Sequence, residues 1–262
     1  PFHLEAYGET TVNYNRDIEV FPVLDAMFRR ISGSSPYKSP TDMGVNMAGN
    51  CISDDEVVCR ASKDEIIRRY FSTMCDSRRG RGSPAAVEKL ELIMQTAGVT
   101  VDERPVVGAA LEKSKSVADP NHPEAVAIEL PDGRIVTGKT SALLGPAAAA
   151  VLNAIKAMCD IPKDVHLIAP STIEPIQQLK VEMLGNRNPR LHTDEILIAL
   201  SSSAAENETA AKALRQLSML KGCDMHSTVI LSSVDTDTIK RLGMYLTCEP
   251  VYEEEDRKYH KR

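Results

Sequence analysis

The segment from Glu124 to Gly138, EAVAIELPDGRIVTG, constrains the fold more than any other part of the sequence. Two runs rich in β-branched residues flank a Pro-Asp-Gly turn, and this pattern predicts an antiparallel β-hairpin. The run GPAAAAVLNAIKAMCD follows, with glycine in the cap position and proline at the first helical position. The hairpin and this helix predict a sheet covered by helices.

The rest of this region continues the alternation of strands and helices. We expect helices within residues 171–184, 192–206, 208–222 and 235–243, and strands at 165–169 (VHLIA), 226–232 (HSTVILS) and 244–252 (MYLTCEPVY). The order hairpin, helix, strand, helices, strand, helix, strand predicts a three-layer α/β/α sandwich over residues 121–252. A charged tail, residues 253–262, follows and is expected to be frayed.

Residues 1–120 are predicted to be a helical subdomain. Helices are expected over 16–32, from Ser53 onward, over 83–98 and over 104–116, with a long polar loop at 33–51. Ser53 and Glu56 have the spacing of a capping box, and Ser62 and Glu65 repeat it, so a second helix could begin at Ser62.

The stretch from Gly133 to Thr140, GRIVTGKT, matches the phosphate-binding loop pattern G-x-x-x-x-G-K-[ST]. Such a loop needs residues that adopt positive φ and a helix directly after the lysine. Ile135 and Val136 are stiff at χ1, and the next helix is expected only near Pro146. We therefore interpret this segment as the second strand of the hairpin.

Composition and charge exclude several classes of protein. The net charge of −6 gives no general attraction for nucleic acid or for an anionic membrane. No apolar run approaches the roughly 20 residues of a membrane span. The six scattered cysteines are typical of reduced thiols, which predicts a cytoplasmic protein. The chain begins without methionine, and we interpret it as a fragment or a processed form.

Polar residues in the long loop form one candidate site. Lys38 and Asp42 are candidates for acid–base catalysis or phosphate binding, and Asn46 is a candidate for ligand binding. The alternative is that these residues only form turns and caps.

A second candidate site precedes the helix expected from residue 192. Asn188 and Arg190 are candidate ligand-binding residues, and His192 is a candidate catalytic residue, because cationic side chains at a helix N-terminus favour an anion. The alternative is ordinary helix capping. Lys139, Thr140 and Ser141 are further ligand-binding candidates, since ligands gather where strands end before helices. We expect these segments and the Lys38 loop to converge on one cleft.

Cys223 and His226 have a Cys-x-x-His spacing. Together with His192 and Glu195 they could form a zinc site. The preferred interpretation is a core thiol and no metal, and the sequence does not identify a cofactor.

The hairpin and the following helix resemble the start of the cytidine deaminases. The deaminase chemistry requires a metal ligand, a nearby glutamate and a later P-C-x-x-C motif. The corresponding positions here fall in PAAAAV and near APSTIEPI, which lack these residues. The resemblance implies a deaminase-like topology without its zinc.

A second resemblance covers essentially the whole chain. The stretches SPYKSPTDMGVNMAG, ELPDGRIVTGKTS, GNRNPRLHTDEILIALSSSAA and HSTVILSSVD resemble the bacterial domain-of-unknown-function family 1846, also called uncharacterised protein family 0371. The sequence resembles the C-terminal half of the family. This resemblance implies that an N-terminal nucleotide-binding domain is missing from the chain.

Two hypotheses about function remain open. The first is an enzyme half that contributes to a site for a phosphorylated or nucleotide-like small molecule, with an unknown reaction. The second is a non-catalytic half that supports the N-terminal domain and forms homo-oligomers. Neither involves nucleic acid or a membrane.

Overall fold

The computed structural model describes residues 15–37, 55–118 and 123–253. The chain divides into two compact units, Pro1–Arg104 and Pro105–Arg262, which we call the first and second units. The fold class is α+β, because helices accompany a mixed four-stranded sheet. None of the helices within the described ranges combines the length and apolar character of a membrane-spanning segment.

The first unit is helical. Its elements are α2 (Asn15–Ser32), α4 (Asp55–Arg78), α5 (Pro84–Ala97) and the short η1 (Val101–Glu103). The helix α4 runs uninterrupted through Ser62, so the second helix start suggested by the Ser62–Glu65 spacing is wrong. Ser83 caps α5 by accepting a hydrogen bond from the Ala86 amide, and Gly98 ends the helix in the left-handed conformation.

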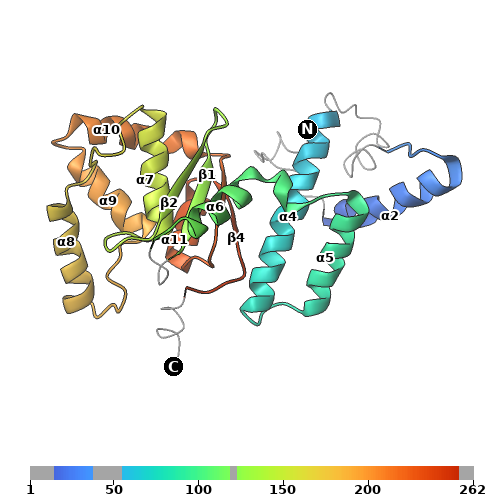
Figure 1. Cartoon of the computed structure of the whole chain (residues 1–262), viewed down its shortest axis with the longest axis horizontal. Helices are drawn as coiled ribbons and strands as arrows, with labels where there is room; N and C mark the ends of the chain where they lie inside the picture. Colours follow the sequence, from blue (N-terminus) through green and yellow to red (C-terminus); the bar gives the residue numbers. More distant parts are fainter. Residues whose placement is uncertain (1–14, 38–54, 119–122, 254–262) are drawn as a thin grey trace. The chain divides into compact units, whose positions relative to one another are not determined.

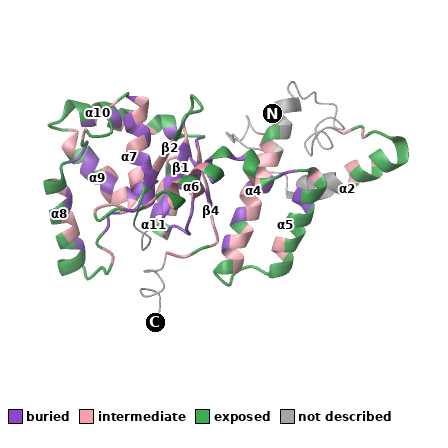
Figure 2. Ribbon diagram, viewed as in Figure 1, coloured by how far each residue is buried: buried purple, intermediate pink, exposed green. Residues whose placement is uncertain are grey.

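The first unit has a small core of its own. Apolar side chains of α4 and α5 are buried, among them Ile67, Phe71 and Ile93. On α4 the spacing of Ile67 and Phe71 places them on one helical face, as amphipathic packing requires. Figure 2 shows short buried segments on α4 and α5, between intermediate and exposed ones.

The second unit is built on a sheet of four strands. These are β1 (Ala125–Glu129), β2 (Ile135–Lys139), β3 (Asp224–Ser227) and β4 (Tyr245–Cys248), in the order β2-β1-β3-β4. Strand β1 is antiparallel to both neighbours, and β3 and β4 are parallel. The hairpin prediction is confirmed, since GRIVTGKT contributes β2 rather than a phosphate-binding loop.

Helices cover both faces of the sheet, and Figure 1 shows the strands between α6 and α7. On one face, Val106 and Ala110 of α6 (Pro105–Lys115) pack on Ala127. On the other face, α7 (Pro146–Met158) passes close over Gly138. Because α6 packs on the sheet, it belongs to the second unit and not to the helical region in which the sequence placed it.

The remaining helices of the second unit extend the main core around α7. They are α8 (Pro170–Gln178), the π-helical turn η2 (Leu179–Met183), α9 (Thr193–Ser203), α10 (Glu208–Leu214), the 3₁₀ turn η3 (Arg215–Leu220) and α11 (Ser233–Arg241). Buried residues of α7, α9, α10, α11 and the strands form one cluster. Figure 2 shows this cluster as the most buried part of the unit.

The strand expected at residues 165–169 is wrong. This segment has no ladder partner, although Leu167 and Ile168 are buried in the main core. A short apolar run of this kind is compatible with a strand or with a buried irregular segment, and periodicity alone does not distinguish them. Lys139 therefore does not lie beside such a strand, because β2 is at the edge of the sheet and pairs with β1.

Candidate functional site

A small pocket in the second unit collects the residues predicted around position 190. We call it the His192 pocket, and its space for solvent is about 50 Å³. Since one water needs roughly 10–15 Å³ of such space, the pocket holds a small group and not a whole nucleotide. It is lined by Gly145, Pro146, Asn188, Arg190, Leu191, His192, Val229, Ile230, Leu231, Ser232, Asp235 and Glu253.

Three helices begin at this pocket. Gly145, His192 and Ser232, the N-cap residues of α7, α9 and α11, all line it. The first turn of a helix carries amide N–H groups without intrahelical partners, and the helix dipole places partial positive charge there. The convergence of three such ends makes the pocket favourable for an anionic group.

His192 and Asp235 form a hydrogen-bonded pair within the pocket. The Nδ1 atom of His192 lies 2.9 Å from Oδ2 of Asp235. The other carboxylate oxygen accepts bonds from the amide and hydroxyl of Thr193, at 2.8 and 2.7 Å. The hydroxyl of Ser232 donates to Oδ2 at 2.8 Å. Asp235 is thus fixed from several sides, and it orients the imidazole so that Nε2 has no protein partner among the described residues.

The pair shifts the pKa of both groups. The hydrogen bond with Asp235 raises the pKa of His192 above its ordinary 6.5, although burial opposes this. Burial alone would raise the pKa of Asp235, but bonds from His192 and Thr193 outweigh it and lower the pKa below 3.8. A protonated His192 is consequently favoured, which adds positive charge to the pocket.

Arg190 is held by contacts with Asn188 and with Glu253. Its side chain is buried and forms an ion pair with Glu253. Its amide donates to Oδ1 of Asn188 at 3.0 Å, so Asn188 shapes the turn that leads into α9. Glu253 also lines the pocket, and it shows that a carboxylate is accommodated beside Arg190.

A buried lysine, Lys180, also holds the segment from Arg190 to Glu195 in place. The Nζ atom of Lys180, in η2, lies 2.7 Å from both the carbonyl oxygen of Arg190 and Oε2 of Glu195. The same Glu195 oxygen accepts the His192 amide at 2.7 Å. Lys180 and Glu195 thereby tie η2 to the start of α9.

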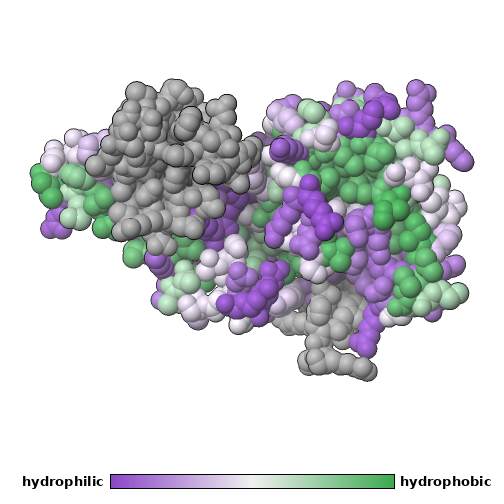
Figure 3. Space-filling model, turned by 180° about the vertical axis from the view of Figure 1, so that it is seen from behind, coloured by the Kyte–Doolittle hydropathy of each residue, from purple (hydrophilic) through white to green (hydrophobic). Residues whose placement is uncertain are grey.

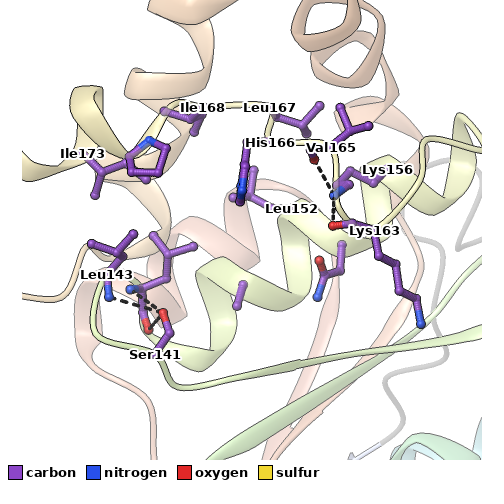
Figure 4. A pocket seen from close by; sticks show the side chains of 14 residues that line it. Ser141, Leu143, Leu152, Lys156, Lys163, Val165, His166, Leu167, Ile168 and Ile173 are labelled. Atoms are coloured by element: carbon purple, nitrogen blue, oxygen red, sulfur yellow. Dashed lines mark hydrogen bonds between the residues drawn. The ribbon is translucent and has the colours of Figure 1, made fainter.

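The other predicted residues are dispersed. Lys139 is exposed, and Thr140 is buried with a hydroxyl that has no partner among the described residues. Ser141 lines a different pocket, which we call the Lys156 pocket (Figure 4). Of the expected convergence, the structure therefore brings together Asn188, Arg190 and His192.

The three candidates in the long loop, Lys38, Asp42 and Asn46, lie outside the described residues, and their convergence with the others stays a prediction.

Cys223 and His226 lie on opposite faces of the sheet. Cys223 belongs to the main core, and burial raises the pKa of its thiol to about 11. His226 is opposite Ala127 on the face that α6 covers, and its Nδ1 lies 2.8 Å from the Thr247 hydroxyl. Within the described ranges, no three His, Cys, Asp or Glu residues are grouped to hold a metal ion.

Sequence reasoning missed Asp235, Ser232 and Lys180. Ser232 and Asp235 have the Ser-x-x-Asp spacing of an ordinary helix start, so nothing in the pattern links them to His192. Lys180 is one charged residue in a helical stretch, and only the fold reveals that it is buried. The partial signal was the helix start itself, because a helix N-terminus favours an anionic ligand.

Comparison with known proteins identifies related sequences over the whole chain. Residues 1–98 match the family model "Domain of unknown function DUF1846, N-terminal", and residues 102–258 match "Domain of unknown function DUF1846, C-terminal". The chain therefore matches both the N-terminal and the C-terminal family model, and the expectation that it resembles only the C-terminal half of the family is wrong. UPF0371 proteins of Streptococcus pneumoniae (strain JJA) and Streptococcus thermophilus (strain ATCC BAA-250 / LMG 18311) are each 54% identical over 261 residues. These matches cover 100% of this chain and 52% of each relative, so the chain spans about half their length.

Proposed function

The chain belongs to the DUF1846 family, an uncharacterised family, and on this premise we propose that its second unit binds the anionic group of a small phosphorylated or nucleotide-like molecule in the His192 pocket. The observation that carries the proposal is the meeting of three helix N-caps with Arg190 and His192 in one pocket. The limited volume means that only the anionic group enters, while the body of the ligand extends from the mouth.

In this proposal His192 is the acid–base group. Asp235 engages Nδ1, which leaves Nε2 for the ligand, and the hydrogen bond with Asp235 raises the pKa of His192, so that its protonated form is favoured more than in a free imidazole. Such an imidazolium can pair with an anion and donate a proton to it. Arg190 supports binding by exchanging its Glu253 partner for the ligand's anionic group.

Titration calorimetry with inorganic phosphate and adenosine monophosphate tests the proposal. We expect both probes to bind, and His192→Gln to weaken binding at least about tenfold, which corresponds to about 1.4 kcal/mol. Glu253→Gln should tighten binding, because a competing carboxylate is removed from Arg190. Lys240→Gln is the control, since Lys240 is exposed on α11 and lines neither this pocket nor the one around Lys156. If neither probe binds, or if His192→Gln binds as the wild type does, the proposal fails.

The topology of the second unit is a separate part of the proposal. We propose that it is a variant of the cytidine-deaminase-like fold without the zinc chemistry. The β1–β2 hairpin with α7 packed on it supports this, and buried alanines of α7 occupy the positions where the metal ligand and glutamate would be needed. Elemental analysis tests the absence of zinc chemistry. About one zinc per chain, lost when residues 146–151 are changed, would contradict it.

A second candidate function is a structural, oligomer-forming half. Exposed apolar side chains at η2 and its C-terminal end favour it, namely Leu179, Met183 and Leu184. In Figure 3 apolar atoms follow the outer edge of the second unit where α8 and η2 lie. Large exposed apolar patches often mark protein interfaces. Sedimentation equilibrium should show an oligomer that Met183→Glu dissociates, and a monomeric wild type would eliminate this candidate.

A further inference from the structure

The Lys156 pocket has no assigned role, and it is larger than the His192 pocket. Its volume is about 230 Å³, against about 50 Å³ for the His192 pocket. Its walls are α7, the turn at 141–144 and the segment at 163–170 (Figure 4). The apolar part of the lining consists of Leu143, Leu144, Ala149, Leu152, Val165, Leu167, Ile168, Pro170 and Ile173.

Lys156 holds one wall of this pocket in place. It is buried, and its Nζ donates to the carbonyl oxygens of Lys163 and Val165 at 2.7 and 2.6 Å. Figure 4 shows both bonds closing the segment onto α7. The pocket is therefore formed in advance, and a ligand would not have to order this wall.

Asn153, one helical turn before Lys156, provides a fixed polar group. Its Nδ2 donates to the carbonyl oxygen of Thr137 at 3.0 Å. Because a carbonyl oxygen only accepts hydrogen bonds, the orientation of the amide is determined, and Oδ1 is the atom left to accept a bond. Asn153 lines the pocket, so a ligand N–H group fits this acceptor.

The titratable residues of the lining are basic. They are Lys156, Lys163 and His166, and the lining contains no Asp or Glu. Asp164 is the acidic residue that acts on Lys156 from outside the lining. The protein as a whole carries a net charge of −6, so this local balance is not a reflection of composition. In Figure 4 the His166 side chain points from the 163–168 segment toward the centre of the ring of lining residues.

We propose that the Lys156 pocket binds a small, largely apolar organic anion that carries one N–H donor. The apolar body contacts Leu143, Leu152 and Ile173, and the N–H group donates to Oδ1 of Asn153. The anionic group lies toward His166. The exposed Lys163 side chain, which extends away from the cavity in Figure 4, folds back to pair with it. A volume below the roughly 300–1,000 Å³ of drug-sized pockets restricts the ligand to about one or two rings. The two pockets share no lining residue, so this site does not depend on the function proposed for the His192 pocket.

Fluorine NMR on the whole chain tests the proposal with two probes, a fluorinated indole carboxylate and the corresponding uncharged fluorinated indole. We expect the carboxylate to bind with a Kd below about 1 mM and the uncharged indole to bind at least about fivefold more weakly. Lys163→Ala should remove most of this difference between the probes. Lys240→Ala, which removes an exposed lysine of α11 elsewhere, should leave it unchanged.

A second variant tests the location. Ala149→Phe places a ring in the pocket and should weaken both probes more than tenfold, whereas Ala85→Phe on α5 should have no effect. If Ala149→Phe does not fold, the Lys163→Ala ratio decides alone. Absence of binding by both probes, equal binding of both probes, or an undiminished preference in Lys163→Ala would overturn the proposal.

Discussion

Gly138 explains at the level of one residue why a phosphate-loop pattern forms a strand here. A Cβ atom at this position would lie 2.2 Å from the amide nitrogen of Ala150 and 2.6 Å from its Cα. The second glycine of the pattern thus serves the close approach of β2 and α7, and no phosphate is needed to account for it. The pattern records glycine and lysine, but it does not record what each one contacts.

We predict that Gly138→Ala destabilises the protein by about 2–4 kcal/mol, because backbone atoms of α7 cannot move aside as a flexible side chain would. Urea unfolding followed by circular dichroism measures the change. Gly108→Ala is the matched control, since a Cβ there meets nothing within 4 Å on an exposed position of α6. The control should stabilise by about 0.5–1 kcal/mol. Equal effects of the two substitutions would contradict the explanation.

The pair of His192 and Asp235 predicts a pH-dependent contribution to stability. Asp235 has a lowered pKa, so its contribution is present above the ordinary 3.8 and is lost as the pH falls through the folded value. His192 has a raised pKa, so its contribution is complete below 6.5 and is lost as the pH rises through the folded value. The pair therefore stabilises most between about pH 4 and 6.5.

Asp235→Asn should reduce the unfolding free energy more at pH 5.5 than at pH 9. The same substitution should lower the NMR titration midpoint of His192, since burial then acts without the opposing carboxylate. Asp237→Asn, an exposed position on the same helix, is the control. An unchanged His192 midpoint would show that the pair does not operate in solution.

The candidate residues themselves were partly predictable at this scale. Asn188, Arg190 and His192 precede a recognisable helix start, and local pattern is enough to group them. Asp235 lies 43 positions from His192, and no local rule relates residues at that distance. The residues at 188–192 could thus be grouped from the sequence, whereas Asp235 joins them only through the fold.

Among the elements, those with marked ends were predictable. The helices α5 and α7 have proline at the start, and α5 ends at Gly98, so their bounds follow from capping chemistry. The segment 165–169 has no such marks. Its apolar residues Leu167 and Ile168 are buried in the main core, but the segment forms no backbone pairing with a strand. The π-helical turn η2 also has no sequence signature, although it places Lys180 under the start of α9.

Lys180 allows a test of how η2 is attached. We predict that Lys180→Met destabilises the protein by about 3 kcal/mol, because Glu195 and the Arg190 carbonyl lose a buried cationic donor. Thermal and urea unfolding measure this value. Adding Glu195→Gln to Lys180→Met should recover part of the loss, since it removes the charge left without its partner. If the two single losses simply add in the double variant, Lys180 and Glu195 do not act as a pair.

At the scale of the whole molecule, the two units have separate cores and separate family matches. Residues 1–98 and 102–258 match different family models, and the structural division falls at Arg104. The sequence indicated two regions through the change from helical to alternating patterns. It did not place α6 with the sheet, because an amphipathic helix does not reveal which partner it covers.

We predict that residues 105–262 fold without the first unit. Their circular dichroism should show a mixed sheet-and-helix protein, and their unfolding should be cooperative, with a midpoint within about 5 °C of one transition of the whole chain. Differential scanning calorimetry makes the comparison. A broad, non-cooperative transition of this piece would show that its core needs the other unit.

The bond from Asn153 to Thr137 also affects how separate molecules meet. Thr137 faces β1 at a position between two hydrogen-bonded pairs, so its carbonyl points outward from an edge strand, where the backbone of another chain could add. The amide of Asn153 already occupies that carbonyl, and Arg134 and Lys139 place charge at the two ends of the strand. The amide that lines the Lys156 pocket therefore also hinders the addition of another strand along this edge.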